Sequence, residues 1–166
     1  MRFFLLLAAG LLTTPLAALA GDVHVERIDI VDKGTYAITI GEETPDPNTP
    51  TGKIAAVTTV KNLKATTTIP GRVGVEFGFQ YVVVGEPAGT EVSLDMVNTY
   101  PAPGLVDPAD PKPLLESRYS RKKKIGDTVY LGYGFENPWE IVPGTWTFEI
   151  WFEGKKLAEQ SFTVTK

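Results

Sequence analysis

The sequence predicts an all-β protein, built as an antiparallel sandwich of two sheets with seven or eight short strands. Three observations support this prediction. Apolar and polar residues alternate along several short segments, as they do in strands with one buried face. Clusters of Gly, Pro and Asp, which are typical turn residues, separate these segments. No segment after residue 20 shows the period of an amphipathic helix.

The N-terminal part of the domain predicts two strands joined by a turn. In residues 23–30 the apolar positions change from odd to even numbers, so we expect a β-bulge at Glu26–Arg27. The next residues, Asp32-Lys33-Gly34, are a turn sequence. Residues 36–40 then predict the second strand, with its even-numbered residues on the buried face.

Later segments follow the same rule. Alternating apolar residues predict strands in 75–83, 92–96, 129–135, 146–152 and 158–164. A turn with Gly and Pro at 85–89 joins the first two of these, and Glu153-Gly154-Lys155 predicts a tight hairpin between the last two. For residues 113–123 the periodicity does not decide between a short helix and a strand.

Two proline-rich segments predict loops. Residues 44–53 contain three prolines, and residues 100–113 contain five. Because proline cannot donate a hydrogen bond to a strand ladder, we expect neither segment to be a central strand. The second loop is long for a connection without regular structure, and such loops are either functional or solvated insertions.

The first twenty residues predict a secretory signal peptide. Arg2 is followed by an apolar run over residues 3–12, and Ala18-Leu19-Ala20 places small residues where a signal peptidase cleaves. The apolar run is too short for a transmembrane span. We therefore expect a signal peptide over residues 1–20 and one domain over residues 21–166, located in the periplasm or secreted.

The composition excludes several kinds of chemistry. The chain has no Cys and only one His, which removes disulfides, thiolate sites and most zinc sites, so we expect no metal and no cofactor. The formal net charge of −4 does not suit a nucleic-acid-binding protein, which carries a surplus of basic residues. No second apolar stretch reaches membrane length, so we expect no membrane span in the mature chain.

The sequence also resembles a known family. Residues 143–164 look like the final hairpin of many immunoglobulin-like sandwiches. Together with Thr68-Ile69-Pro70, Gly74, Phe77-Gly78 and Tyr100-Pro101, they resemble a family of small exported bacterial proteins that is catalogued as a domain of unknown function. The resemblance implies an immunoglobulin-like fold and a periplasmic or secreted location. It brings no catalytic residues.

Candidate catalytic residues are few. His24 would have to serve any Ser-His-Asp mechanism, but no G-x-S-x-G motif accompanies it, and it lies near the predicted mature N terminus. The carboxylates of Glu42–Glu43, and of Asp107 with Asp110, lie beside loop prolines, where we expect them to be exposed and ionised. Gly132-Tyr133-Gly134 has no following helix that could bind phosphate, so we interpret its glycines as strand positions that another backbone or a ring approaches closely.

Candidate binding residues lie in three segments. The basic cluster at residues 118–124 stands out in an acidic chain and suits either an anionic ligand or a solvated edge strand. Trp139 lies beside two helix- and strand-breaking residues, where it would either anchor a partner or fold back over the end of the sandwich. The third segment is the second proline loop. The candidates are Arg118, Tyr119, Arg121, Lys122, Lys123, Lys124, Trp139 and Tyr100.

The sequence therefore predicts an exported, non-catalytic binding or interaction module that contacts an unidentified protein or an anionic envelope component. The alternative is a small periplasmic hydrolase or metal-dependent enzyme, which would need His24 in a cleft with carboxylates. A third possibility is a subunit whose first or last strand has a free edge and accepts a partner strand.

Overall fold

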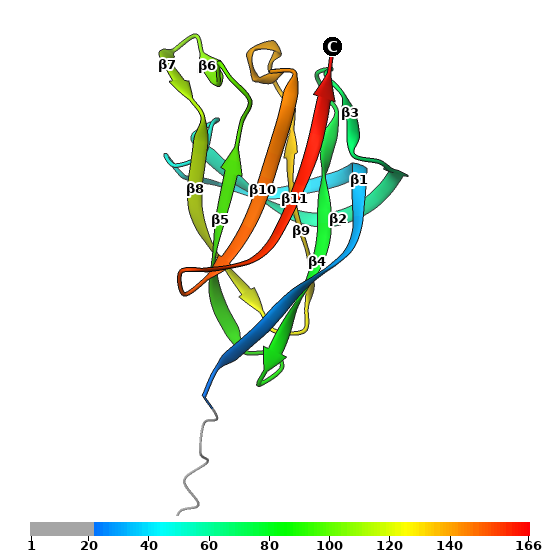
Figure 1. Cartoon of the computed structure of the whole chain (residues 1–166), viewed down its shortest axis with the longest axis vertical. Helices are drawn as coiled ribbons and strands as arrows, with labels where there is room; N and C mark the ends of the chain where they lie inside the picture. Colours follow the sequence, from blue (N-terminus) through cyan, green and yellow to red (C-terminus); the bar gives the residue numbers. More distant parts are fainter. Residues whose placement is uncertain (1–21) are drawn as a thin grey trace, which may run out of the picture.

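The computed structural model describes residues 22–166, and the predicted signal peptide lies outside these residues. Figure 1 shows the strands and the one short 3-10 helix in this part of the chain. These elements are β1 (His24–Pro45), β2 (Lys53–Ala65), β3 (Thr68–Pro70), β4 (Glu76–Glu86), β5 (Glu91–Thr99), β6 (Leu105–Asp107), β7 (Asp110–Leu114), β8 (Glu116–Lys124), β9 (Thr128–Gly134), η1 (Pro138–Glu140), β10 (Gly144–Phe152) and β11 (Lys155–Thr165).

The strands form two packed sheets and one small hairpin (Figure 1). The first sheet has the strand order β2-β1-β4-β9, the second has the order β3-β11-β10-β5-β8, and β6 pairs with β7. All of these pairings are antiparallel except that of β3 with β11. The predicted all-β sandwich is therefore confirmed. The strand number exceeds the expected seven or eight because β2, β3 and the β6–β7 hairpin were not predicted.

The core between the two sheets is rich in aromatic rings. Phe77 of β4 lies at its centre, and its ring centroid is 5.7 Å from that of Phe148, 5.7 Å from that of Trp146 and 5.4 Å from that of Phe162. All four side chains are buried. Burial of such rings is the main favourable term in folding a sandwich of this size. The inward faces predicted for residues 75–83 and 92–96 are also buried, which confirms the alternation used to predict them.

β1 is one long strand where the sequence predicts two strands and a turn. Gly34 continues the strand with φ of +151°, and a Cβ at this position would lie 1.9 Å from the carbonyl oxygen of Lys64. Glycine therefore lets β1 bend sharply against β2 without reversing direction. The bulge expected at Glu26–Arg27 is confirmed by a shift in the pairing register between Val25 and Arg27.

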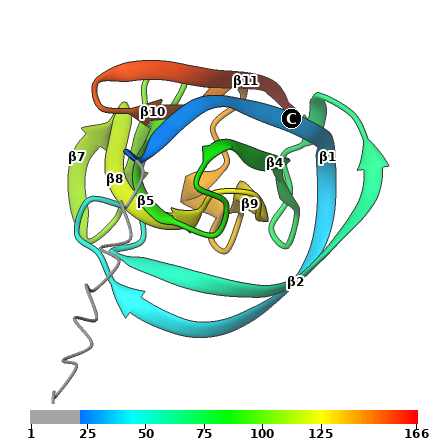
Figure 2. The same ribbon diagram turned by 90° about the horizontal axis from the view of Figure 1, so that it is seen from below.

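β1 changes partners along its length. Residues 24–36 pair with β4, and residues 34–45 pair with β2. Beyond Tyr36, β1 and β2 form a two-stranded ribbon, and Figure 2 shows it swinging out from the body and around β9. We call residues 36–45 of β1 together with β2 the ribbon. The first proline loop forms its tip, where the amide of Asp46 donates a 2.9 Å hydrogen bond to the carbonyl of Gly52.

Two further predictions are settled by the strands that follow β5. The second proline-rich segment is not a plain loop, because it contains the β6–β7 hairpin. Residues 113–123 belong to β7 and β8, so the strand is correct and the short helix is not. Within residues 22–166, the structure contains no helix of the length and apolar character that a membrane span requires.

Candidate ligand-binding cavity

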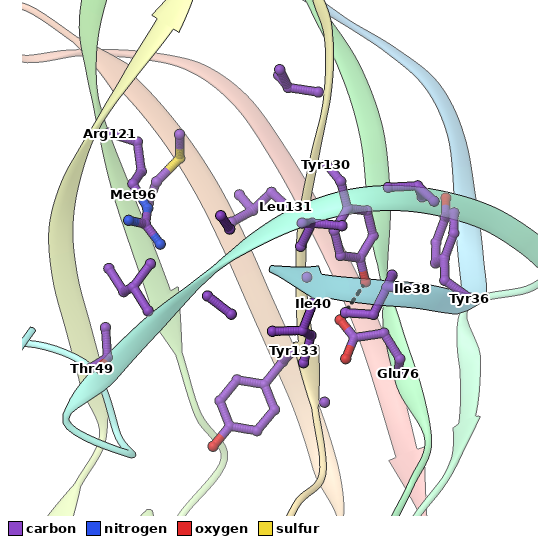
Figure 3. A pocket seen from close by; sticks show the side chains of 18 of the residues that line it. Tyr36, Ile38, Ile40, Thr49, Glu76, Met96, Arg121, Tyr130, Leu131 and Tyr133 are labelled. Carbon is purple, nitrogen blue, oxygen red and sulfur yellow. Dashed lines mark hydrogen bonds between the residues drawn. The ribbon is translucent and has the colours of Figure 1, made fainter. Parts of the chain in front are cut away.

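A cavity of about 990 Å³ lies beneath the ribbon (Figure 3). Its walls come from the ribbon, from β4 and β9 of the first sheet, and from β5 and β8 of the second. Since β9 and β8 are end strands of their sheets, the cavity lies along one open side of the sandwich. Figure 2 shows the ribbon passing around β9, and the cavity lies between the ribbon and the two sheets. Its volume is at the upper end of the range for small-molecule sites, roughly 300–1,000 Å³.

The ribbon presents an apolar face to the cavity and a polar face to solvent. Ile38 is paired with Val60, and Ile40 with Val57, and all four line the cavity. The pair between them, Thr39 with Thr59, is exposed and does not line the cavity. Directly opposed residues of an antiparallel pair project from the same face, so the four apolar side chains form one surface. Ile40 remains 47% exposed and Val57 36% exposed, so residues 22–166 leave part of this surface uncovered.

β8 divides the basic cluster between two faces, as period-two alternation requires. The residues that line the cavity and are half-buried are Tyr119, Arg121 and Lys123. The exposed residues on the opposite face are Arg118, Lys122 and Lys124, although Lys122 also borders the cavity. The cluster is therefore not one continuous cationic patch.

The outer basic residues have partners at the protein surface. Arg118 lies 3.8 Å from the carboxylate of Glu116, and its guanidinium carbon lies 5.8 Å from the centroid of the Trp151 ring. The ammonium group of Lys122 lies 3.0 Å from the carboxylate of Glu91. Surface pairs of this kind contribute little stability, but they locally neutralise the outer face of β8.

The two inner cations lie close together without a carboxylate partner. Within residues 22–166, neither Arg121 nor Lys123 forms a salt bridge. The Arg121 guanidinium carbon lies 5.5 Å from the centroid of the Tyr119 ring. Burial lowers the pKa of Arg121, and burial together with the nearby charge of Arg121 lowers the pKa of Lys123. The shift of Arg121 reports the cost of burying its charge, and that of Lys123 also reports the repulsion from Arg121.

A buried amide lies beside these cations. Asn98 of β5 is 2% exposed and lines the cavity, and its amide nitrogen donates a long hydrogen bond of 3.4 Å to the hydroxyl of Tyr119. Its side-chain oxygen has no hydrogen-bond partner among the described residues. A buried acceptor without a partner is costly, so this oxygen is suited to receive a hydrogen bond from a bound molecule or water.

The β4 side of the cavity is acidic. The hydroxyl of Tyr130 donates a 2.8 Å hydrogen bond to the carboxylate of Glu76 (Figure 3). Burial, opposed by the hydrogen bond from Tyr130 and assisted by the nearby charge of Glu136, raises the pKa of Glu76 to about 7. The ring of Tyr36, at the base of the ribbon, lies edge-on to that of Tyr130 with centroids 4.9 Å apart.

The glycines of β9 make room for this acidic group. A Cβ on Gly132 would lie 1.9 Å from the Tyr130 hydroxyl oxygen, and a Cβ on Gly134 would lie 2.2 Å from a carboxylate oxygen of Glu76. The predicted close approach of a ring or backbone is confirmed at Gly132, which the Tyr130 phenol approaches, whereas the group at Gly134 is the carboxylate of Glu76.

Two contacts fix the ribbon at its base and its tip. At the base, the Tyr36 hydroxyl donates a hydrogen bond to Asp32, whose second carboxylate oxygen accepts a 2.9 Å bond from the Gln80 amide. Near the tip, the ammonium of Lys53 lies 3.3 Å from the carboxylate of Glu136, which follows β9. The ribbon is thus attached to the sandwich on both sides of the cavity.

Comparisons with known proteins identify the family and the fold of this chain. The model of a family described as a domain of unknown function, DUF3859, matches residues 25–164. The chain belongs to this family. A solved structure of an immunoglobulin-like protein from Pseudomonas aeruginosa resembles this member of DUF3859 with a TM-score of 0.56 and 22% sequence identity, covering 89% of this chain and 100% of that chain. At that identity the likeness shows the fold, which is immunoglobulin-like. No curated protein matches the chain.

Tyr100 and Trp139, like Arg118 and Lys124, do not line this cavity of the DUF3859 chain. Tyr100 is a core residue and not an exposed loop residue, because its ring packs against Trp146 and its hydroxyl lies 2.7 Å from that of Ser117. Trp139 is half-buried on η1, packs against the core, and lines a second cavity of about 420 Å³ beside the ribbon tip. It therefore folds back over the end of the sandwich, one of its two predicted arrangements.

The candidate catalytic residues do not come together. His24 is exposed at the start of β1 and lines neither of the two cavities described above. Asp107 and Asp110 face each other across the β6–β7 hairpin and border the second cavity. Among residues 22–166, no group of three or more His, Cys, Asp or Glu side chains is arranged to hold a metal ion.

The first and last strands each keep a stretch of edge without a partner strand among the described residues. β1 pairs with β2 only from Gly34 onward, so its residues 24–33 are paired on one side, with β4. β11 pairs with β3 only at residues 163–165, so its residues 155–162 are paired on one side, with β10. The residues that sequence reasoning missed are those of the ribbon, Glu76 and Tyr130. The signal for the last two was the Gly132-Tyr133-Gly134 sequence, which indicated a close approach without naming the approaching group.

Proposed function

We propose that this protein is an exported, non-catalytic binding module that takes a small ligand with an anionic group into the cavity beneath the ribbon. The observation that carries the proposal is the composition of the cavity walls. Arg121 and Lys123 face the cavity without a carboxylate partner among the described residues, while the opposite wall is the uncovered apolar face of the ribbon. Concave sites with apolar walls and a few converging polar groups are typical of ligand binding.

The surroundings of Glu76 favour binding over catalysis. The pKa of Glu76 lies near neutrality, as that of a general acid or base would. However, its hydrogen bond comes from Tyr130, and the exposed His24 lies elsewhere on the molecule. The other carboxyl group on this side of the cavity, that of Glu136, is exposed and lies 3.3 Å from the ammonium of Lys53, so it is not arranged as the second acid–base group that hydrolysis needs. We therefore assign Glu76 a role in shaping the acidic end of the cavity.

The exported location is part of the same proposal. The charged, apolar and small-residue regions of residues 1–20 have the order of a secretory signal peptide. An anionic component of the bacterial envelope is then the kind of ligand that the protein would meet. Protease accessibility in intact cells and after outer-membrane permeabilisation, compared with a cytoplasmic marker, tests this location. Protection equal to that of the marker after permeabilisation would contradict it.

The cavity is tested with the neutral fluorescent dye Nile red and a variant that fills the space. Val57→Trp projects a large ring from the ribbon into the cavity, whereas Val31→Trp adds the same ring at an exposed position of β1 outside it. We expect the wild-type protein and V31W to bind the dye with the same affinity and V57W to bind at least tenfold more weakly. Equal binding by the two variants, or no binding by the wild type, would contradict the proposal.

A further inference from the structure

We infer that the ligand of this cavity is a single-chain amphiphile with one anionic group, in which Arg121 and Lys123 hold the anion and the ribbon covers the apolar chain. This inference rests on the proposed function and names the chemical class of its ligand. It follows from three properties of the walls: where the unpaired charges lie, where the uncovered apolar surface lies, and where the acidic groups lie.

The charges place the anionic group. Arg118 and Lys122, on the outer face of β8, lie near the carboxylates of Glu116 and Glu91, respectively. Arg121 and Lys123 face inward and form no salt bridge within the described chain. A carboxylate between these two cations would accept charge-assisted hydrogen bonds from both and would relieve their mutual repulsion.

The ribbon places the apolar chain. Ile40 and Val57 project toward the cavity and remain substantially exposed, although both belong to a face that alternates with polar residues on the other side. Covering apolar surface is favourable by about 25 cal/mol per Å². In Figure 3, Ile40 lies between Arg121 and Glu76, and Ile38 lies beside Glu76. A chain held at Arg121 would therefore extend over these side chains toward β4.

The acidic side of the cavity limits the ligand to one anion. Glu76 lies on the side of the cavity away from Arg121 (Figure 3), and Glu136, which also lines the cavity and pairs with Lys53, is close enough to raise the pKa of Glu76. The Glu76 carboxyl group raises the cost of a second negative charge there. A dianion with charges at both ends would meet cations at one end and carboxyl groups at the other. A neutral apolar terminus avoids this conflict, so the cavity favours a monoanion over a dianion of equal length.

The inward direction of the two cations favours a free amphiphile over a membrane surface. Binding to an anionic bilayer needs cations on an exposed face, where they can reach the headgroups. Here the exposed outer cations have carboxylates nearby, and the unpaired pair lies beneath the ribbon. We therefore expect the protein to extract a single chain into the cavity, with no binding to the surface of an anionic vesicle.

A ligand series tests this inference on the wild-type protein. Isothermal titration, with each ligand below its micellar concentration, compares dodecanoate with dodecanol, dodecyltrimethylammonium and dodecanedioate. We expect dodecanoate to bind at least tenfold more tightly than the other three, since one charge-assisted hydrogen bond is enough for this difference. Dodecanoate binding no tighter than dodecanol would overturn the inference. Retained Nile red binding would then leave the proposed cavity standing, whereas loss of both would remove the cavity as well.

Variants with equal charge loss locate the anion. The double variant R121Q/K123Q removes the inner pair, and R118Q/K124Q removes two exposed cations of the same strand. We expect the inner variant to lose at least tenfold in dodecanoate affinity while keeping its Nile red affinity, and the outer variant to keep both. Equal losses in the two variants would indicate a general effect of net charge and overturn the assignment. Binding to phosphatidylglycerol vesicles that R118Q/K124Q abolishes would point instead to a membrane-docking face.

Discussion

Glu76 shows how one side chain is fitted into the fold by its neighbours. Tyr130 donates a hydrogen bond to its carboxylate, and Gly134 leaves the space that a Cβ would fill. The half-buried carboxyl group is nevertheless easier to bury when protonated, so its pKa rises. Gly134 is thus needed because the Glu76 carboxylate, which is distant in the sequence, occupies the space beside it.

The raised pKa of Glu76 predicts a pH dependence of stability. The value of about 7 in the folded protein exceeds the ordinary value of 4.5, so between these pH values the folded state holds a proton that the unfolded state has released. The free energy of unfolding should therefore decrease by about 1–3 kcal/mol as pH rises from 4.5 through 7, and level off above that. Glu76→Gln should remove this part of the slope.

Urea titrations of the wild type, E76Q and E153Q at several pH values measure this effect. Glu153 lies exposed at the tip of the final hairpin, so E153Q controls for the loss of one acidic residue. We expect the wild type and E153Q to share the slope and E76Q to be flatter. An identical slope in all three proteins would show that Glu76 does not titrate in this window.

The sequence predicted buried residues correctly where apolar and polar residues alternate regularly. It did not predict the direction in which the side chains of residues 118–124 and of Tyr100 point. The basic residues of 118–124 were found as a cluster, but their division between two faces depends on residues 113–123 being a strand, which periodicity did not decide. Tyr100 was assigned to the surface because prolines follow it. The structure instead turns its ring inward against Trp146, a contact that only tertiary packing determines.

At the scale of elements, the ribbon is the part that the sequence concealed. Its apolar residues on β2 are Ile54, Val57, Val60 and Leu63, which are spaced by three and do not alternate. The register with β1 is irregular at several points, including a shift between Thr39 and Ile40, and this shift allows Val57 and Val60 to face the same side. The register shifts in the ribbon therefore interrupt the alternation of apolar and polar residues along β2, and the sequence does not indicate this strand.

The bend in β1 predicts that a side chain at position 34 destabilises the protein. Gly34→Ala would place a Cβ 1.9 Å from the Lys64 carbonyl oxygen and strain the backbone at φ of +151°. We expect it to lower the free energy of unfolding by at least about 2 kcal/mol. Gly52→Ala, at the ribbon tip, also introduces Ala at positive φ but meets no atom within 4 Å, so it should cost only about 1 kcal/mol.

Chemical denaturation of the two variants separates the clash from the cost of positive φ. Dye binding by G34A at low denaturant then reports whether the ribbon still encloses the cavity. A G34A variant as stable as G52A would mean that β1 can carry a side chain at its bend. Glycine at position 34 would then not explain the path of the ribbon.

At the scale of the whole molecule, the sandwich is built from the features that the sequence made clear. The alternation in β4, β5, β10 and β11 predicted the sheets, and their buried rings form the shared core. The open side between β8 and β9 was not predictable, because it depends on which strands end each sheet. The cavity arises there, where the ribbon passes over an edge that the two sheets leave uncovered.

The most direct test of a binding site beneath the ribbon is an NMR titration of the isotope-labelled protein with dodecanoate, followed by measurement of intermolecular nuclear Overhauser effects. We predict intermolecular nuclear Overhauser effects between the alkyl chain and the methyl groups of Ile38, Ile40 and Val57, and the largest chemical-shift changes in β8 at Arg121 and Lys123. Contacts confined to the outer face of β8, or no contact with the ribbon methyl groups at saturating dodecanoate, would contradict a binding site beneath the ribbon.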